Sequence, residues 1–194
     1  MKSFITGFLS ILLAAIIIAA LPTEADAEIY TDTLRLHILA ASDGEEDQAL
    51  KLRVRDAILA EFSDRLSGAS GIGEAKEVTE SLLAEIESRA EAVVAESGFS
   101  YTVTASLSEE WYDTREYGDF TLPRGIYSSL IIRIGEGQGR NWWCVMYPPM
   151  CLDLATDAPS DDWAGGYTGE ELSLISGKYR VKFKLLELIS DFSK

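Results

Sequence analysis

Alternation of apolar and polar side chains predicts the first strand of this chain. Between Thr33 and Ala41 every second residue is apolar, and Arg35 and His37 occupy positions between them. A period of two is typical of a strand with one buried face. The set expected to face the core is Leu34, Leu36 and Ile38.

A helical period follows this strand. Ser42 and Asp43 are candidate N-caps of a helix that runs to about Phe62. Its main apolar stripe consists of Leu50, Val54, Ala57 and Ile58. Leu52 and Leu59 lie nearly opposite that stripe. A helix that is apolar on two sides is either clamped between layers or presents one side to a partner.

The remaining pattern predicts a second helix and then several strands. The helix is expected over Glu74–Ser97, with Gly98 placed to end it. Alternating or β-branched runs predict strands over Tyr101–Leu107, Tyr127–Ile134, Asn141–Tyr147 and Tyr179–Leu185, with a further strand containing Trp111, Tyr112 and Tyr117. This order predicts a single α+β domain, with two helices on one face of a mostly antiparallel sheet.

A glycine-rich segment joins two of these strands. A phosphate-binding loop needs a helix behind it, whereas a strand follows Gly135–Gly139, so we interpret this segment as a hairpin turn. Trp142 and Trp143 are adjacent and therefore point to opposite faces of the sheet. One is expected in the core. The other is either a partner anchor or part of a second covered face.

The N-terminus has the features of a secretory signal. Lys2 precedes an apolar run from Ile5 to Leu21, and Ala25–Ala27 matches the small-x-small cleavage pattern. We expect residues 1–27 to be a signal peptide and residues 28–194 to be the exported domain. The alternative is an uncleaved anchor, which the short apolar run disfavours.

Charge limits the possible partners. The whole chain has a net charge of −15, and the signal segment contributes only Lys2, Glu24 and Asp26. The exported domain is therefore strongly acidic. A nucleic-acid-binding basic surface is excluded, and stable membrane insertion after cleavage is not expected.

Both cysteines lie in one short segment. Outside the cytoplasm, Cys144 and Cys151 are expected to form a disulfide around the turn at Pro148 and Pro149. The alternative is a pair of reduced, buried cysteines. A zinc site is improbable because His37 is the only histidine and structural sites need four ligands.

No catalytic motif or cofactor site stands out. A hydrolase triad needs a nucleophile and an orienting acid beside His37, and none is singled out. We therefore expect a non-catalytic protein without a cofactor, although carboxylate pairs remain possible in so acidic a chain. A local basic face of Arg180, Lys182 and Lys184 is either paired internally or a docking patch for an acidic partner.

Two long motifs resemble the stage II sporulation protein R family. They span Leu36–Ala57 and Gly135–Cys151, and the Lys182–Glu187 segment is similar too. The resemblance implies a signalling protein that is secreted from the forespore into the space between forespore and mother cell. There it would activate a membrane-embedded aspartic protease, which processes the mother-cell sigma factor precursor.

The sequence also suggests where such a protease could bind. The candidates are the large apolar and the basic side chains with no assigned structural role, namely Leu52, Leu59, Trp142, Trp143, Arg180, Lys182 and Lys184. Two other functions remain open: a secreted hydrolase that uses His37 or carboxylates, and a structural coat component, which the lack of repeats disfavours.

Overall fold

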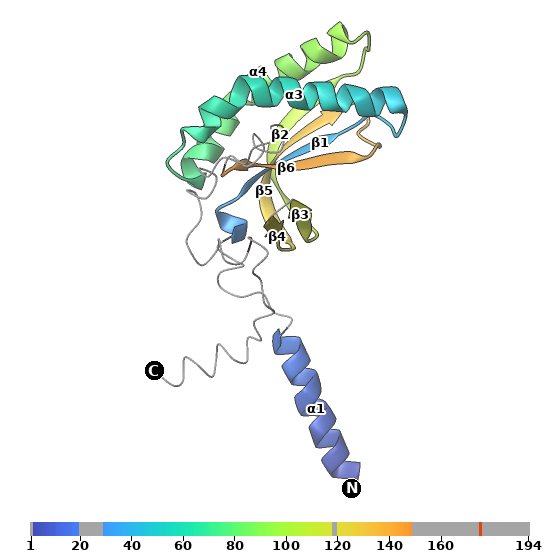
Figure 1. Ribbon diagram of the computed structural model, residues 1–194, viewed down its shortest axis with the longest axis vertical. Helices are drawn as coiled ribbons and strands as arrows, with labels where there is room; N and C mark the ends of the chain where they lie inside the picture. Colours follow the sequence, from blue (N-terminus) through green and yellow to red (C-terminus); the bar gives the residue numbers. More distant parts are fainter. Residues whose placement is uncertain (1, 20–28, 118–119, 149–174, 176–194) are drawn as a thin grey trace.

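The fold is a mixed sheet with helices on one side. The structure is a computed structural model that describes residues 2–19, 29–117, 120–148 and 175. Its elements are α1 (Lys2–Ala19), β1 (Leu34–Leu39), α3 (Glu45–Ser67), α4 (Ile72–Glu96), β2 (Val103–Tyr112), β3 (Arg115–Tyr117), β4 (Phe120–Leu122), β5 (Gly125–Ile134) and β6 (Asn141–Tyr147). The predicted α+β class is confirmed (Figure 1).

The main sheet has the order β2-β5-β1-β6. β1 runs parallel to β5 and antiparallel to β6, and β2 runs antiparallel to β5. β3 and β4 form a separate antiparallel pair. The expectation of a mostly antiparallel sheet therefore holds for two of its three pairings, while the central pairing is parallel.

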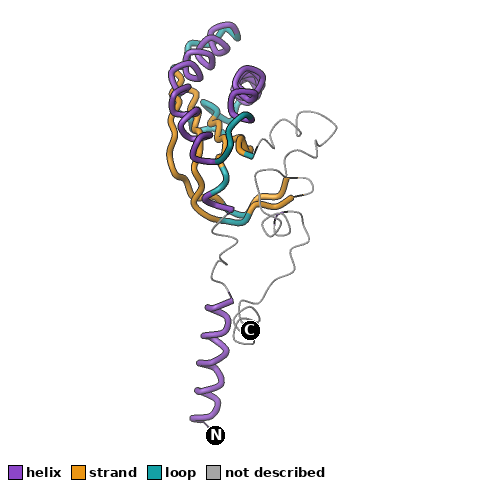
Figure 2. Tube along the Cα trace, turned by 90° about the vertical axis from the view of Figure 1, so that its left-hand side faces the viewer, coloured by secondary structure: helices purple, strands orange, loops and turns teal. Residues whose placement is uncertain are grey.

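Both helices pack on the same face of the sheet, as the sequence predicted (Figures 1 and 2). The apolar side chains of β1 contact the inner sides of α3 and α4 in one cluster. Fully buried members of this cluster include Leu34, Leu36, Ile38, Leu50, Val54, Ile58 and Ile86. Burial of each such side chain contributes roughly 1.5–3 kcal/mol, so this layer is the main core.

The opposite face of β1 is also buried, which corrects the expectation of one buried face. Arg35 is completely buried and His37 is 7% exposed. β1 lies between two strands, and a second cluster covers this face. That cluster contains Ile29, Tyr112, Phe120, Leu122, Tyr127, Val145 and Ile175. The Arg35 guanidinium lies 3.8 Å from the ring centroid of Tyr112, and it donates a hydrogen bond to the Tyr117 hydroxyl.

The loop before α3 differs from the predicted cap. Gly44 is the N-cap residue, and no side chain caps the helix. The Ser42 hydroxyl donates to Asp47 and accepts from the Gly44 amide, while Asp43 accepts from the Arg140 amide at 2.7 Å. Ser42 and Asp43 therefore fix the loop against the β5–β6 connection instead of capping the helix.

The glycine-rich segment is not a hairpin turn. β5 and β6 lie on either side of β1, so the chain must cross the end of β1 to reach β6. The Gly139 amide donates to the Ala40 carbonyl at 2.9 Å. A Cβ at residue 139 would lie 2.1 Å from the Ser42 carbonyl oxygen, so only glycine fits this crossing. The prediction failed because a local pattern does not show which strands pair.

Two further boundaries differ from the sequence prediction. Trp111 and Tyr112 belong to the end of β2 and not to a separate strand, while Tyr117 belongs to β3. The predicted strand over residues 179–185 lies outside the described residues.

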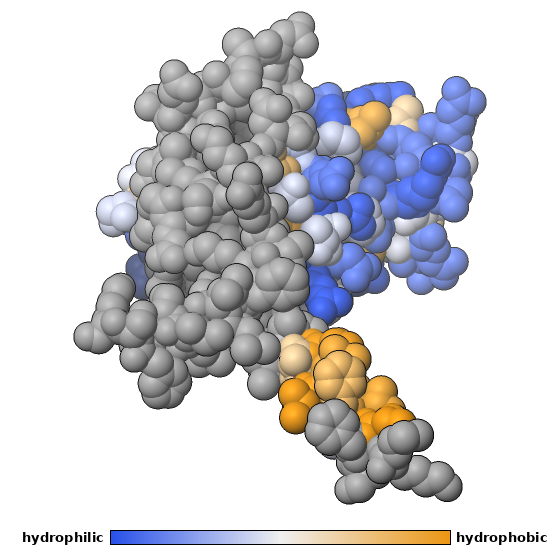
Figure 3. All heavy atoms as spheres, turned by 60° about the horizontal axis from the view of Figure 1, so that its bottom comes forward, coloured by the Kyte–Doolittle hydropathy of each residue, from blue (hydrophilic) through white to orange (hydrophobic). Residues whose placement is uncertain are grey.

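α1 has an apolar exposed surface, which appears orange in Figure 3. Phe8 and Ile11 are 63% and 72% exposed. Among the described residues, none of the helices combines the length and hydropathy needed to span a bilayer. The expected cleavage site at residue 27 lies outside the described residues.

Candidate functional site

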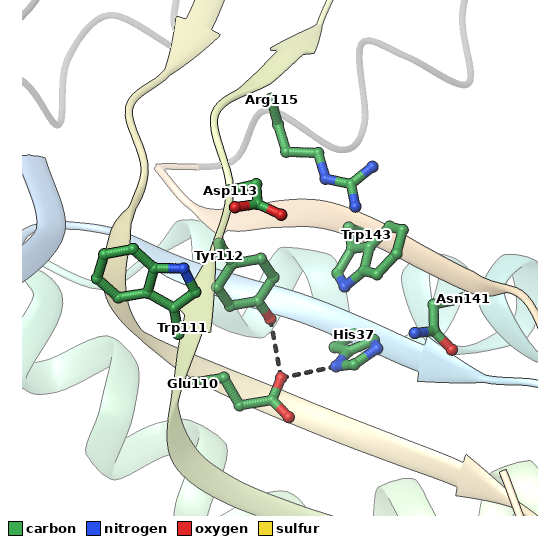
Figure 4. A pocket seen from close by; sticks show the side chains of 8 residues that line it. All are labelled: His37, Glu110, Trp111, Tyr112, Asp113, Arg115, Asn141 and Trp143. Atoms are coloured by element: carbon green, nitrogen blue, oxygen red, sulfur yellow. Dashed lines mark hydrogen bonds and ion pairs between the residues drawn. The ribbon is translucent and has the colours of Figure 1, made fainter. Parts of the chain in front are cut away.

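A pocket of about 330 Å³ lies on the sheet face opposite the helices (Figure 4). It forms where the end of β2 meets β1, β3 and β6. Its lining residues are His37, Glu110, Trp111, Tyr112, Asp113, Arg115, Asn141 and Trp143. Titratable and aromatic side chains from four strands and a loop therefore converge in one place, which makes this pocket the candidate site.

His37 lies at the base of the pocket. Its Nδ1 lies 2.6 Å from Oε2 of Glu110. Because a carboxylate oxygen only accepts hydrogen bonds, the tautomer that fits this contact has its proton on Nδ1. Its ring stacks on Trp143 with centroids 5.4 Å apart and an interplanar angle of 25°. Its Nε2 is buried and has no hydrogen-bond partner among the described residues. The carboxylate and the indole thus orient the imidazole, while one ring nitrogen remains available.

A hydroxyl network supports Glu110. The Tyr112 hydroxyl donates to Oε2 of Glu110 at 3.2 Å and lies 2.8 Å from Oγ of Ser129. Burial raises the pKa of the Tyr112 phenol far above its usual value. Tyr112 therefore stays protonated at physiological pH and acts as a neutral donor.

Arg115 and Trp143 form the upper wall of the pocket in Figure 4. The Arg115 guanidinium lies 3.7 Å from the centroid of the Trp143 ring, a cation–π contact. Its Nε is buried without a partner among the described residues. The imidazole of His37 stacks on the same indole, so the imidazole and the Arg115 guanidinium both pack against Trp143.

This arrangement provides an imidazole oriented by a carboxylate. No serine, threonine or cysteine is among the lining residues, so the described part of the pocket offers no aliphatic hydroxyl or thiol. The described residues also contain no group of three or more potential metal ligands. The oriented imidazole could activate water, and the pocket could bind a polar ligand.

The predicted partner residues have different positions. Leu52 is 37% exposed on α3, as a contact residue requires. The expectation for Leu59 is wrong, because Leu59 is only 7% exposed and belongs to the core cluster that includes α4. α4 packs against the side of α3 that carries Leu59. Of the two alternatives given by the sequence, a helix clamped between layers or a side presented to a partner, the first therefore applies at Leu59.

The two tryptophans divide between the faces, as predicted. Trp142 packs against the main core, and the Arg55 guanidinium lies 4.3 Å from its ring centroid. Trp143 faces the pocket. The second face is itself covered by an apolar cluster, so neither indole is a fully exposed anchor.

Some predicted residues stay untested. Cys144 is buried on β6, but Cys151 lies outside the described residues, so the Cys144–Cys151 bond remains a prediction. The basic residues Arg180, Lys182 and Lys184 also lie outside them.

Sequence reasoning missed Glu110, Arg115 and Asn141 as neighbours of His37. Their approach depends on the register of β2, where Glu110 lies opposite Tyr127, and on β6, where Trp143 lies opposite His37. No local pattern encodes such pairings. The only available signal was the isolated histidine on a strand.

Comparison with known proteins identifies similar chains. The family model described as stage II sporulation protein R matches residues 30–157. A stage II sporulation protein R from Bacillus subtilis (strain 168) is 36% identical over 124 residues, which cover 64% of this chain and 55% of that protein. The chain thus spans about half the length of this curated relative. No solved structure matches.

Proposed function

Because this chain belongs to the stage II sporulation protein R family, we propose that it is an exported signalling protein of sporulation that acts without catalysis. It is made in the forespore and enters the space between forespore and mother cell. There it binds the extracytoplasmic part of a membrane-embedded aspartic protease. Binding activates the protease, which then processes the mother-cell sigma factor precursor.

The observation that carries this proposal is the extent of the family match. Residues 30–157 include every strand that the structure describes, both helices that cover the sheet and all the described pocket residues. The apolar N-terminal run supports export, and the acidic composition supports a role away from nucleic acid and anionic lipid.

The test is co-production of the full chain with the protease and the sigma precursor in a host that does not sporulate. Immunoblotting should show the shortened sigma factor only when all three proteins are present. Equal processing without this chain would refute the proposal. A protease variant that lacks a catalytic aspartate is the control for cleavage by host enzymes.

A second candidate is a secreted hydrolase, favoured by one observation. The 2.6 Å contact between His37 and Glu110 is the geometry of a general base held by a carboxylate. His37→Gln keeps a donor for Glu110 and removes the proton-transfer group. Under the signalling proposal, this variant, if folded, still supports processing. Loss of processing in a variant that folds and binds the protease would favour the hydrolase.

A further inference from the structure

The pocket contains three buried polar atoms that have no hydrogen-bond partner among the described residues. They are Nε2 of His37, Oδ1 of Asn141 and Nε of Arg115. All three side chains line the same pocket of about 330 Å³ (Figure 4). A buried polar atom without a partner costs free energy in the folded state, and native structures contain few of them. Their gathering around one pocket is typical of a ligand site.

The hydrogen-bonding roles of these atoms restrict the chemistry of the ligand. Nε2 of His37 is an acceptor, because the contact with Glu110 places the proton on Nδ1. Oδ1 of Asn141 is also an acceptor, whereas the Nε–H of Arg115 can only donate. The ligand must therefore offer donors and an acceptor together. A carboxylate alone has no donor, and an ammonium group alone has no acceptor.

The two ends of the pocket differ in charge. In Figure 4 the guanidinium of Arg115 lies at the upper end. The side chains of His37, Glu110 and Asn141 lie at the lower end. Both side-chain hydrogen bonds to Glu110 are made by its Oε2, which leaves Oε1 as a further acceptor there. The upper end therefore suits an anionic group, and the lower end suits a cationic donor.

The charge of Arg115 is not cancelled by a neighbouring carboxylate. Arg115 forms no ion pair with Asp113 or with any other carboxylate in the described part of the chain. Asp113 is exposed, so solvent screens its charge. The guanidinium is held instead on the Trp143 ring, 3.7 Å from its centroid. This contact fixes the guanidinium without neutralising it, which leaves it available to an anionic group.

The volume and the walls of the pocket limit the size of the ligand. A volume of about 330 Å³ is near the lower end of the range for small-molecule sites, so the pocket admits one small molecule and not a long peptide. The rings of Tyr112 and Trp143 line it on two sides in Figure 4. Aromatic walls offer apolar surface for the uncharged part of a ligand.

We propose that the pocket binds a free amino acid in its zwitterionic form. The carboxylate of the ligand accepts hydrogen bonds from the Arg115 guanidinium, and its side chain packs against the aromatic walls. Its ammonium group donates to Nε2 of His37 and to Oδ1 of Asn141, and the Glu110 carboxylate balances its charge. All three unpartnered atoms are thereby bonded. The inference goes beyond the proposed function and does not depend on it, because it concerns a small-molecule site.

NMR titration of the purified full chain tests the inference directly. His37 is the only histidine, so its imidazole nitrogens give signals that no other histidine overlaps. The probe is L-leucine. Its controls are N-acetyl-L-leucine, which lacks the ammonium group, and L-leucinamide, which lacks the carboxylate. Glycine is a second probe, because it has both charged groups and no side chain.

L-leucine should shift the Nε2 signal of His37 in a saturable way. It should bind at least about tenfold more tightly than either control, because each control lacks one charged contact. If neither L-leucine nor glycine shifts this signal, ordered water alone satisfies the three atoms and the inference is wrong. Equal affinity for L-leucine and both controls would also overturn it.

Arg115→Gln separates the effect of the pocket from that of overall charge. This variant should bind L-leucine about tenfold more weakly and L-leucinamide equally well, since only the carboxylate contact is lost. The matched control is Arg53→Gln at an exposed position of α3, which changes net charge equally and should leave both affinities unchanged. Equal weakening in the two variants would overturn the inference. If Arg115→Gln does not fold, the comparison of ligands on the unmodified chain decides it.

Discussion

At the scale of single residues, Leu52 and Leu59 of α3 show that packing between the helices decides whether an apolar side chain is part of the core or exposed. Leu52 and Leu59 lie on nearly the same side of the helix. Leu59 is buried in the core cluster that also contains α4 side chains, while Leu52, two turns earlier on α3, is 37% exposed. The same sequence feature therefore has two structural meanings, and the two residues should respond differently to charge.

Leu59→Lys should lower the free energy of unfolding by at least about 3 kcal/mol, because it removes buried apolar area and places an unpaired charge in the core. Leu52→Lys should change it by less than about 1 kcal/mol. Urea unfolding followed by circular dichroism measures both values. Equal losses would show that Leu52 is also a core residue.

Tyr112 should make stability sensitive to alkaline pH. Burial raises the pKa of the Tyr112 phenol above the ordinary tyrosine value of about 10, so the folded state keeps the proton that the unfolded chain releases. Its contribution is fully present below about pH 10 and is lost as pH rises towards the folded-state pKa. In Tyr112→Phe, the free energy of unfolding should fall less between pH 9 and pH 11, as measured by urea titration. An identical decline in both proteins would contradict this assignment.

At the scale of elements, the local pattern of apolar and polar residues predicted which helices and strands form better than it predicted which strands pair. The helix expected over Glu74–Ser97 is α4, Ile72–Glu96, and Gly98 ends it with a φ of 83°. The predicted and observed helices agree because the helical period of apolar residues and the glycine that ends a helix are both local signals. The crossing at Gly139 and the approach of Glu110 to His37 depend on strand order, which no local signal carries.

The crossing at Gly139 should tolerate no side chain. Gly139→Ala should destabilise the fold by about 2 kcal/mol or more, because its Cβ would meet the Ser42 carbonyl oxygen at 2.1 Å. Gly73→Ala is the matched control, since nothing lies within 4 Å of a Cβ there and alanine favours the helix. In thermal unfolding, the melting temperature should fall for Gly139→Ala and rise for Gly73→Ala. Unchanged stability in Gly139→Ala would mean that the β5–β6 connection does not pack closely against Ser42 in the loop that follows β1.

At the scale of the whole molecule, the N-terminal segment predicts that the protein is exported. If residues 1–27 are a cleaved signal, mass spectrometry of the extracytoplasmic protein should show Glu28 as the first residue. Replacing three apolar residues of the run with lysine should retain the protein inside the cell. A mature protein that begins at Met1 and stays in the membrane fraction would contradict cleavage.

In the proposed function, this chain activates the protease by contact from outside the cytoplasm. The most direct measurement adds purified residues 28–194 to the extracytoplasmic side of vesicles that hold the protease and enclose the sigma precursor. Processing should rise with added protein, saturate as a binding curve and persist with His37→Gln. Processing that never depends on the added protein, or that requires His37 in a folded, protease-bound variant, would contradict it.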